Sequence, residues 1–106
     1  MAKYMAKASY TAEGTQGLLK DGGSARLAAV TKVVKKLGGK VETFYFAYGA
    51  ADAIVIVDMP DETSALALSL AVNASGAVTL EMVQLISPKQ MDEAAKLTVG
   101  YRAPGA

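Results

Sequence analysis

Apolar residues along the chain are spaced by three and four in some segments and run together with β-branched and aromatic residues in others. The first pattern is typical of helices and occurs at Leu27, Val30 and Val34, whereas the second is typical of strands and occurs at 53–58, AIVIVD. Glycine, proline and helix-capping residues separate the segments. We expect strands at 3–10, 41–48, 53–58 and 78–86, and helices at 11–20, 24–37, 61–74 and 87–97, each helix counted with its capping residue.

Local signals support the junctions between these segments. Ser24 follows a glycine break and is suited to cap the second helix, and Asp61 is suited to cap the third. The glycine pair at 38–39 ends the second helix, because glycine readily adopts the left-handed conformation found after a helix. Residues 49–52 form the turn of a β-hairpin, where Asp52 is expected to bond local backbone.

The order of the predicted elements defines a fold. It is β-α-β-β-α-β, in which the helices at 11–20 and 24–37 both lie in the first crossover, with one further helix at the C-terminal end. Right-handed crossovers place both main helices on the same face of the sheet. We therefore expect an α+β protein of the ferredoxin-like kind, with a four-stranded antiparallel sheet. The other face of that sheet would be bare.

Neither strand of the hairpin alternates apolar and polar residues as a half-solvated strand should, at 44–48 (FYFAY) or at 53–57 (AIVIV). The economical cover for the bare face is the same face of a second copy. The helix at 61–74 is also apolar on two sides, because Leu66 and Leu68 lie about 200° apart. The last helix or a neighbouring subunit would cover its outer side. We expect a homodimer with a two-fold pair of sheets, and we favour this explanation of the apolar surfaces over a greasy ligand site.

Length and composition agree with a small oligomeric domain. At 106 residues the chain fits one domain, which we place at 1–100, followed by an irregular tail at 101–106. Apolar residues make up 52% of the chain, and a small monomer has little interior for such a surplus. The formal net charge is only +1 and the basic residues are scattered, whereas nucleic-acid binding requires a dense basic face. We expect no nucleic-acid partner.

The chain has no cysteine and no histidine, which removes much of enzyme chemistry. Thiolate nucleophiles, iron–sulfur sites, Ser-His-Asp triads, His-ligated haem and the usual zinc and copper sites are excluded. A cation held by carboxylates is still possible, but we expect no catalytic residue set, no metal and no cofactor. No stretch reaches about 18 consecutive apolar residues, and the first ten lack the apolar core of a signal peptide, so we expect a cytoplasmic protein without a membrane partner.

The glycine-rich segment at 21–26 is the segment most suited to face a ligand. Gly22 and Gly23 open onto the start of a helix, where free backbone N–H groups attract anions, and Arg26 adds a forked donor. The segment lacks the phosphate-loop pattern and follows a helix rather than a strand. The simpler explanation, which we favour, is that the glycines only separate two helices and Ser24 only caps the second.

Five further side chains are candidate ligand contacts, each with a structural alternative. Lys7 would be a reactive amine if it pointed into a dimer cavity, but it could instead pair with Glu81 or Glu42 on a neighbouring strand. The tyrosines could line a pocket or fill the core and the interface, and the asparagine could reach a ligand or satisfy a backbone group. The structural alternative is the more common outcome in each case. The tyrosines are Tyr10, Tyr45 and Tyr48, and the asparagine is Asn73.

Several short motifs occur in the order found in one bacterial family. They lie at 9–11, 22–26, 37–40, 44–46, 49–52, 59–61 and 73–78. On these residues the chain resembles the GYD domain family, over almost its whole length. The family is named for a Gly-x-Tyr-Asp turn, which Gly49 and Asp52 match, while Ala51 stands where the tyrosine is expected. The resemblance implies a dimeric α/β-barrel fold and a biochemical role that is in general uncharacterised.

Three functions remain open on the sequence. The first is a non-catalytic small-molecule-binding or regulatory module that acts as a homo-oligomer and takes a small apolar or anionic ligand. The second is a cofactor-independent oxygenase or isomerase that uses Lys7, Tyr45 and Asn73. The third is a structural assembly unit whose apolar helix and tail join higher oligomers. We rank them in that order.

Overall fold

The computed structural model describes all 106 residues and contains every element that the pattern predicts. Each boundary lies within two residues of its predicted position. In chain order the elements are β1 (Ala2–Tyr10), α1 (Ala12–Asp21), α2 (Gly23–Lys36), β2 (Lys40–Phe46), β3 (Ala53–Met59), α3 (Glu62–Ala74), β4 (Val78–Leu85) and α4 (Pro88–Ala95).

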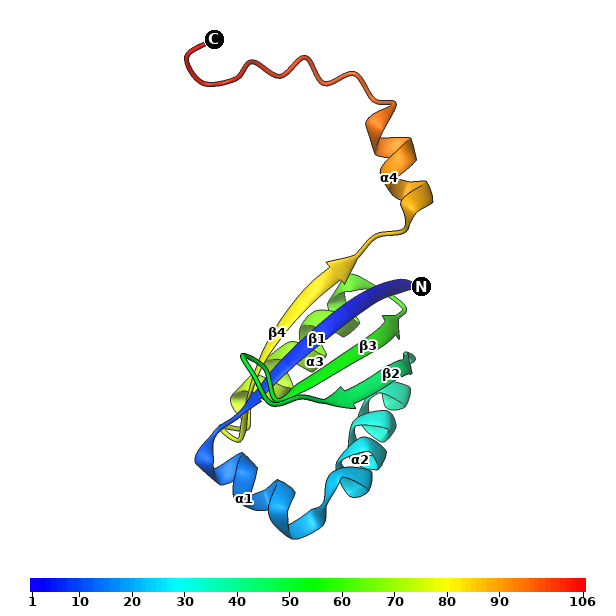
Figure 1. Ribbon diagram of the computed structural model, residues 1–106. Helices are drawn as coiled ribbons and strands as arrows, with labels where there is room; N and C mark the ends of the chain where they lie inside the picture. The colour runs from blue at the N-terminus through cyan, green and yellow to red at the C-terminus, as the bar shows by residue number, and fades with distance from the viewer.

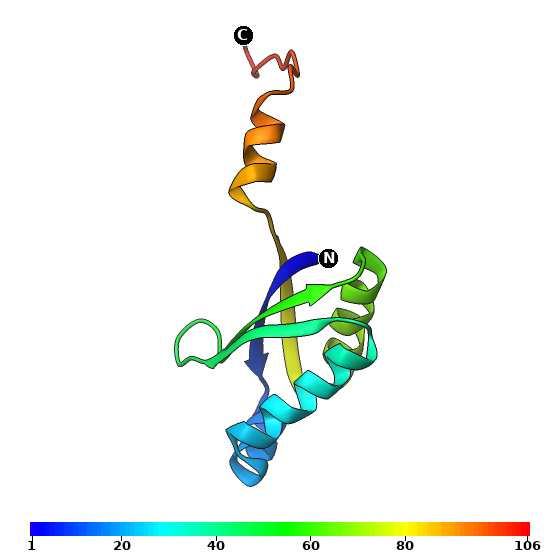
Figure 2. The same cartoon turned by 90° about the vertical axis from the view of Figure 1, so that its right-hand side faces the viewer.

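The four strands form one antiparallel sheet in the order β2-β3-β1-β4 (Figure 1). β1 is therefore a central strand, paired with β3 on one side and with β4 on the other. The helices α2 and α3 both lie on one face of this sheet (Figure 2). The predicted α+β class with β-α-β-β-α-β order is confirmed.

The hydrophobic core lies between the sheet and these two helices. Val34 of α2 and Met59 of β3 are completely buried, and Leu68 of α3 joins the same cluster. Burying a side chain of this kind stabilises a fold by about 1.5–3 kcal/mol. The sheet supplies small residues on this face as well, among them Ala6 and Ala53. Because their side chains are small, they leave a small apolar cavity beneath the helices.

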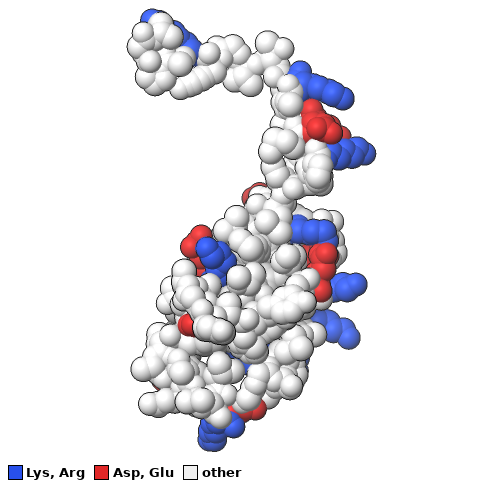
Figure 3. All heavy atoms as spheres, in the orientation of Figure 1, with Lys and Arg blue, Asp and Glu red and all other residues white.

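The opposite face of the sheet has no cover within the chain. Along β3, buried residues alternate with half-buried ones, and Ile54 and Ile56 belong to the half-buried set. Ile56 pairs with Met5 of β1, which in turn pairs with Val83 of β4. In Figure 3, which views this face, the middle of the sheet is largely uncharged and the charges lie toward its edges. Both faces of the hairpin are apolar, as the missing alternation predicts.

α3 is apolar on two sides, and only one of them is covered. Leu68 is buried against the sheet, whereas Leu66 and Leu70 are exposed on the outside of the helix. α4 does not cover them, because it continues away from the end of β4 together with the tail (Figures 1 and 2). The radius of gyration is 16.9 Å as a result, against about 13 Å for a compact chain of this length. None of the helices has the length and hydropathy to cross a membrane.

The start of α2 differs from the prediction. Ser24 does not cap this helix; it lies within its first turn, and Gly22 occupies the N-cap position without any side-chain hydrogen bond. Gly22 has a φ of 84°, a left-handed conformation that glycine adopts without steric cost. The chain therefore changes direction at a single residue between α1 and α2, and the new helix begins before Ser24 is reached (Figure 1).

Candidate functional site

A cavity of about 240 Å³ opens where β1 ends, β4 begins and α1 meets α2. Tyr10, Gly22 and Arg26 line it, together with small residues of both helices. Gly14 fixes one wall, because a Cβ at this position would overlap the carbonyl oxygen of Ala77. α1 can therefore lie directly against the start of β4, and Tyr10 meets two residues of the glycine-rich segment, Gly22 and Arg26, in one place.

Arg26 extends from the first turns of α2 into this cavity. Its guanidinium carbon lies 6.0 Å from the centre of the Tyr10 ring, at the outer limit of a cation–π contact. The Nε–H group of Arg26 is buried and has no hydrogen-bond partner. Arg26 also forms no ion pair, since both ion pairs of the chain are made by Lys3. A buried polar group without a partner costs about 1–3 kcal/mol, and more when it is charged.

Arg26 also borders two further cavities. One lies beneath the helices, has a volume of about 50 Å³, and is lined by fourteen residues of which thirteen are hydrophobic. The other is a groove of about 340 Å³ between α2 and α3. The guanidinium therefore lies at the junction of three spaces, of which two are almost entirely apolar.

The backbone of Tyr10 is held by the turn between β2 and β3. The N–H of Tyr10 donates to Asp52 Oδ2 at 2.8 Å, and the N–H of Asp52 donates to the carbonyl oxygen of Ala8 at 2.8 Å. Asp52 itself accepts from the N–H of Ala47 through its carbonyl oxygen. The aspartate bonds backbone, as expected, but its side chain reaches a strand forty-two positions away rather than its own turn.

Gly23 plays a different part from Gly22. A Cβ on Gly23 would lie 2.9 Å from the ring of Phe46, so this glycine allows α2 to approach the end of β2. It borders Phe46 and is not among the residues that line the cavity. Of the glycine-rich segment, Gly22 and Arg26 thus face the cavity and Gly23 faces the sheet.

Lys7 and Tyr45 lie on the uncovered face of the sheet, away from this cavity. Lys7 pairs in register with Glu81 of β4 and Ile54 of β3, but it makes no ion pair. Tyr45 pairs with Ile54 from the other side and is exposed. Tyr48 lies in the turn beyond β2 and is fully exposed in the single chain.

Asn73 of α3 is occupied by backbone contacts. Its Oδ1 accepts from the N–H of Leu80 at 2.7 Å, and its Nδ2 donates to the carbonyl oxygens of Leu80 and Ser69. The side chain therefore joins α3 to β4, an edge strand. This is the structural alternative weighed for Asn73 on the sequence.

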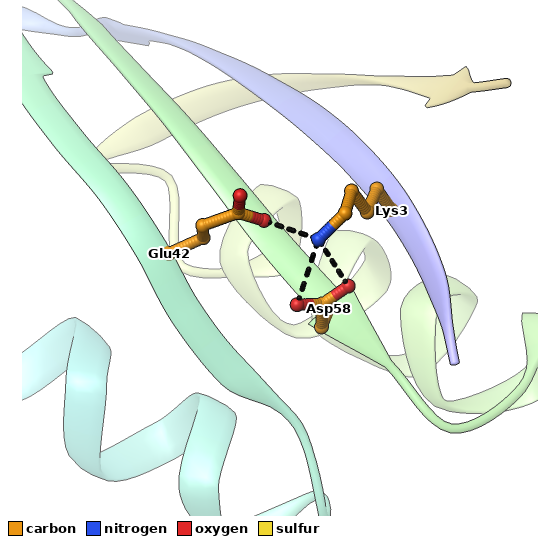
Figure 4. Close-up of polar contacts among 3 residues, drawn as sticks. All are labelled: Lys3, Glu42 and Asp58. Carbon is orange, nitrogen blue, oxygen red and sulfur yellow. Dashed lines mark hydrogen bonds and ion pairs between the residues drawn. The ribbon is translucent and has the colours of Figure 1, made fainter. Parts of the chain in front are cut away.

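A cluster of charges that no sequence signal singled out lies at the other end of the uncovered face. Lys3 Nζ lies 2.6 Å from Glu42 Oε2 and 3.1 Å from Asp58 Oδ1 (Figure 4). Hydrogen bonds with Glu42 and Asp58 raise the pKa of Lys3 above its ordinary value of 10.5. These side chains are solvent-accessible, so the cluster adds little to stability.

Tyr4 is a second residue that the pattern did not single out. It is buried on the helix-facing side of β1, and its hydroxyl group has no hydrogen-bond partner. It borders a shallow hollow with Glu62 and Ser69 of α3. No group of three or more acidic residues is arranged to hold a metal ion.

An antiparallel four-stranded sheet with two crossover helices on one face defines an α+β protein of the ferredoxin-like class. The family model described as GYD domain matches residues 4–95, and the chain belongs to the GYD domain family. Comparisons with curated proteins and with solved structures gave no match. Ala51, in the turn before Asp52, is buried, so a small side chain occupies the position where the motif tyrosine is expected.

Proposed function

We propose that this protein is a non-catalytic small-molecule-binding or regulatory module that acts as a homo-oligomer. The ligand would bind at Arg26, in the cavities that meet at this residue. The observation that carries the proposal is the buried, unpartnered Nε–H of Arg26 at the junction of three cavities. A buried donor without a partner destabilises the protein, and an acceptor on a ligand would remove this cost by forming the missing hydrogen bond.

The enzyme hypothesis has less support. Its three candidates do not converge, because Lys7 and Tyr45 lie on the uncovered face of the sheet and Asn73 lies on the helical layer. A cofactor-independent reaction needs its groups within about 3 Å of the same reacting atom. The two faces of one sheet are farther apart than that.

The binding function is tested with a ligand screen on the full chain. Thermal unfolding is followed with a panel of metabolites and inorganic anions, and hits are confirmed by titration calorimetry. We expect at least one hit whose affinity falls at least tenfold in Arg26→Gln. Lys32→Gln, an exposed lysine on the same helix, should leave the affinity unchanged. A panel without any stabilising compound would count against the proposal, as would a hit equally affected by both substitutions.

A structural assembly unit is the second candidate, and the C-terminal arm favours it. We call the segment from Ile86 to the chain end the arm. Every residue of the arm is exposed, although Met91, Leu97, Val99 and Tyr101 are large and hydrophobic. Such residues are usually covered by a partner. Light scattering distinguishes the two functions, because a ring or shell supports an assembly unit and a discrete dimer does not. The cytoplasmic location stays a prediction.

A further inference from the structure

The three cavities around Arg26 differ in polarity. The cavity between α1 and α2 is also lined by Glu13 and Asp21, so it carries two negative charges besides the guanidinium. In the cavity beneath the helices, Arg26 is the only charged residue. The groove between α2 and α3 is lined by ten residues, eight of them hydrophobic, and Arg26 is again the only charged one. One cation therefore faces two apolar spaces.

On the basis of the proposed function, we propose that the ligand is an organic carboxylate with an apolar body. Its carboxylate would accept hydrogen bonds from the Arg26 guanidinium, and its apolar body would occupy the groove between α2 and α3. A fatty acid and an arylalkanoic acid both have this chemistry. The structure of Arg26 favours it, because the planar guanidinium fork matches a carboxylate with two parallel hydrogen bonds.

The charges around the site favour a monoanion over a phosphate. Arg26 supplies one positive charge, and no carboxylate of the chain forms an ion pair with it. Glu13 and Asp21 line the cavity between α1 and α2, so a ligand with two negative charges would meet more repulsion here than a ligand with one. A ligand without a hydrogen-bond acceptor would leave the buried Nε–H of Arg26 unpaired, which is the costly state that binding should remove.

The groove fits an apolar body. α2 packs against β2 and α3 packs against β4 and β3, so the two helices stand apart rather than against each other. Val30 and Val33 of α2 face Leu68, Ala71 and Val72 of α3 across the gap. Its volume of about 340 Å³ is within the range of small-molecule sites. Each methylene group of a ligand that this groove buries should raise the affinity about fourfold.

The test is a homologous series of straight-chain acids from acetate to decanoate, titrated into the full chain by calorimetry and ¹H–¹⁵N NMR. We expect the affinity to rise about fourfold per methylene over part of the series and then to level off where the groove is filled. The matched primary amides should bind at least tenfold weaker, and inorganic phosphate should not compete. Phenylalkanoic acids form a second arm, and whichever arm binds more tightly identifies the apolar body.

Two variants separate the carboxylate contact from folding. Arg26→Gln should abolish the preference for acid over amide, with residual binding of the apolar body, and Arg26→Lys should retain part of the preference. Lys32→Gln is the matched control. If Arg26→Gln unfolds, the preference retained by Arg26→Lys and the NMR shifts of Val33 and Ala71 still test the contact.

Several outcomes would overturn this inference. Acids and amides of equal affinity would refute the carboxylate class but leave the proposed function intact. Shifts centred on Ile56, on the uncovered face of the sheet, would refute the location. If neither this series nor the wider panel binds, the proposed function itself fails.

Discussion

The carboxylate of Asp61 caps α3, and folding lowers the pKa of this group. Its Oδ1 accepts a hydrogen bond from the backbone N–H of Ser64 at 2.7 Å. Hydrogen bonding with Ser64 holds the pKa of Asp61 below its ordinary value of 3.8. A carboxyl group with a lowered folded-state pKa stabilises the fold above its unfolded pKa, and that contribution is lost as pH falls through the folded value.

We therefore predict a pH-dependent difference between the wild type and Asp61→Asn. Asparagine also caps helices but does not titrate. Urea unfolding should give a free energy of unfolding for the wild type that exceeds that of the variant at pH 7. This excess should shrink as pH falls below about 3.8. Other carboxyl groups titrate in both proteins and cancel in the difference, so a difference that stays constant with pH would refute the prediction.

The polar contacts of single residues were the hardest feature to predict. Lys7 and its possible partners were foreseen, yet Lys3 makes the ion pairs. The outcome depends on register: β1 pairs Lys3 with Asp58, and an irregularity in β2 between Val41 and Thr43 brings Glu42 to the same side. A hydrophobic pattern identifies strands but does not fix which residue faces which, so a shift of one position changes every polar pair.

At the scale of elements, Asn73 attaches α3 to the edge strand β4. Asn73→Ala would leave the N–H and the carbonyl oxygen of Leu80 without their side-chain partner. We predict a loss of about 1–2 kcal/mol in the free energy of unfolding, measured with urea. Asn73→Asp retains an acceptor for the N–H and should lose less.

Ligand binding gives the control for this prediction. If Asn73 is structural, Asn73→Ala should bind a ligand found for the Arg26 cavity with unchanged affinity at a temperature where it is folded. An unchanged stability combined with a large loss of affinity would assign Asn73 to the ligand instead.

Gly39 tests how closely α2 packs on the sheet, and Gly17 in α1 serves as its control. A Cβ on Gly39, between α2 and β2, would lie 2.5 Å from the carbonyl oxygen of Asp58 and 2.7 Å from the sulfur of Met59. Gly39→Ala should therefore lower the free energy of unfolding by about 1–3 kcal/mol through overpacking. Gly17→Ala is the matched control, because nothing outside the helix's own backbone lies within 4 Å of a Cβ there. This substitution should stabilise α1 by about 0.5–1 kcal/mol. Equal effects of the two substitutions would contradict this packing.

The elements could be predicted well because their signals are local. The hairpin at 49–52, the cap at Asp61 and the stop at Gly38 depend on residues within a few positions of each other. The cavity of Tyr10 and Arg26 could not, because it arises where α1 turns away from the sheet and small residues leave space beneath α2. The prediction that Ser24 caps α2 is also wrong, because the left-handed conformation of Gly22 sets the start of the helix at Gly23, one residue before Ser24.

At the scale of the whole molecule, the single chain exposes more surface than a compact protein of its size. Its accessible area is 7479 Å², whereas a folded monomer of 10.9 kDa exposes about 5,600 Å². A standard interface buries about 800 Å² on each partner. The excess is large enough for one such interface, and the uncovered sheet face and the arm are the two surfaces that could supply it.

We predict that the full chain is a dimer of two 10.9 kDa subunits that pair through their uncovered sheet faces. Ile56 lies in the interior of that face, between β1 and β2, and an unpaired charge there would be buried in the interface. Light scattering after gel filtration should therefore give a dimer for the wild type and a monomer for Ile56→Glu. Leu70→Glu is the control, because Leu70 is an exposed leucine on the outer side of α3, and it should leave the dimer intact.

A monomeric wild type at about 100 µM would refute the dimer. Dissociation by Leu70→Glu alone, or by removal of the arm alone, would move the interface to the helical side and favour the assembly unit over the binding module.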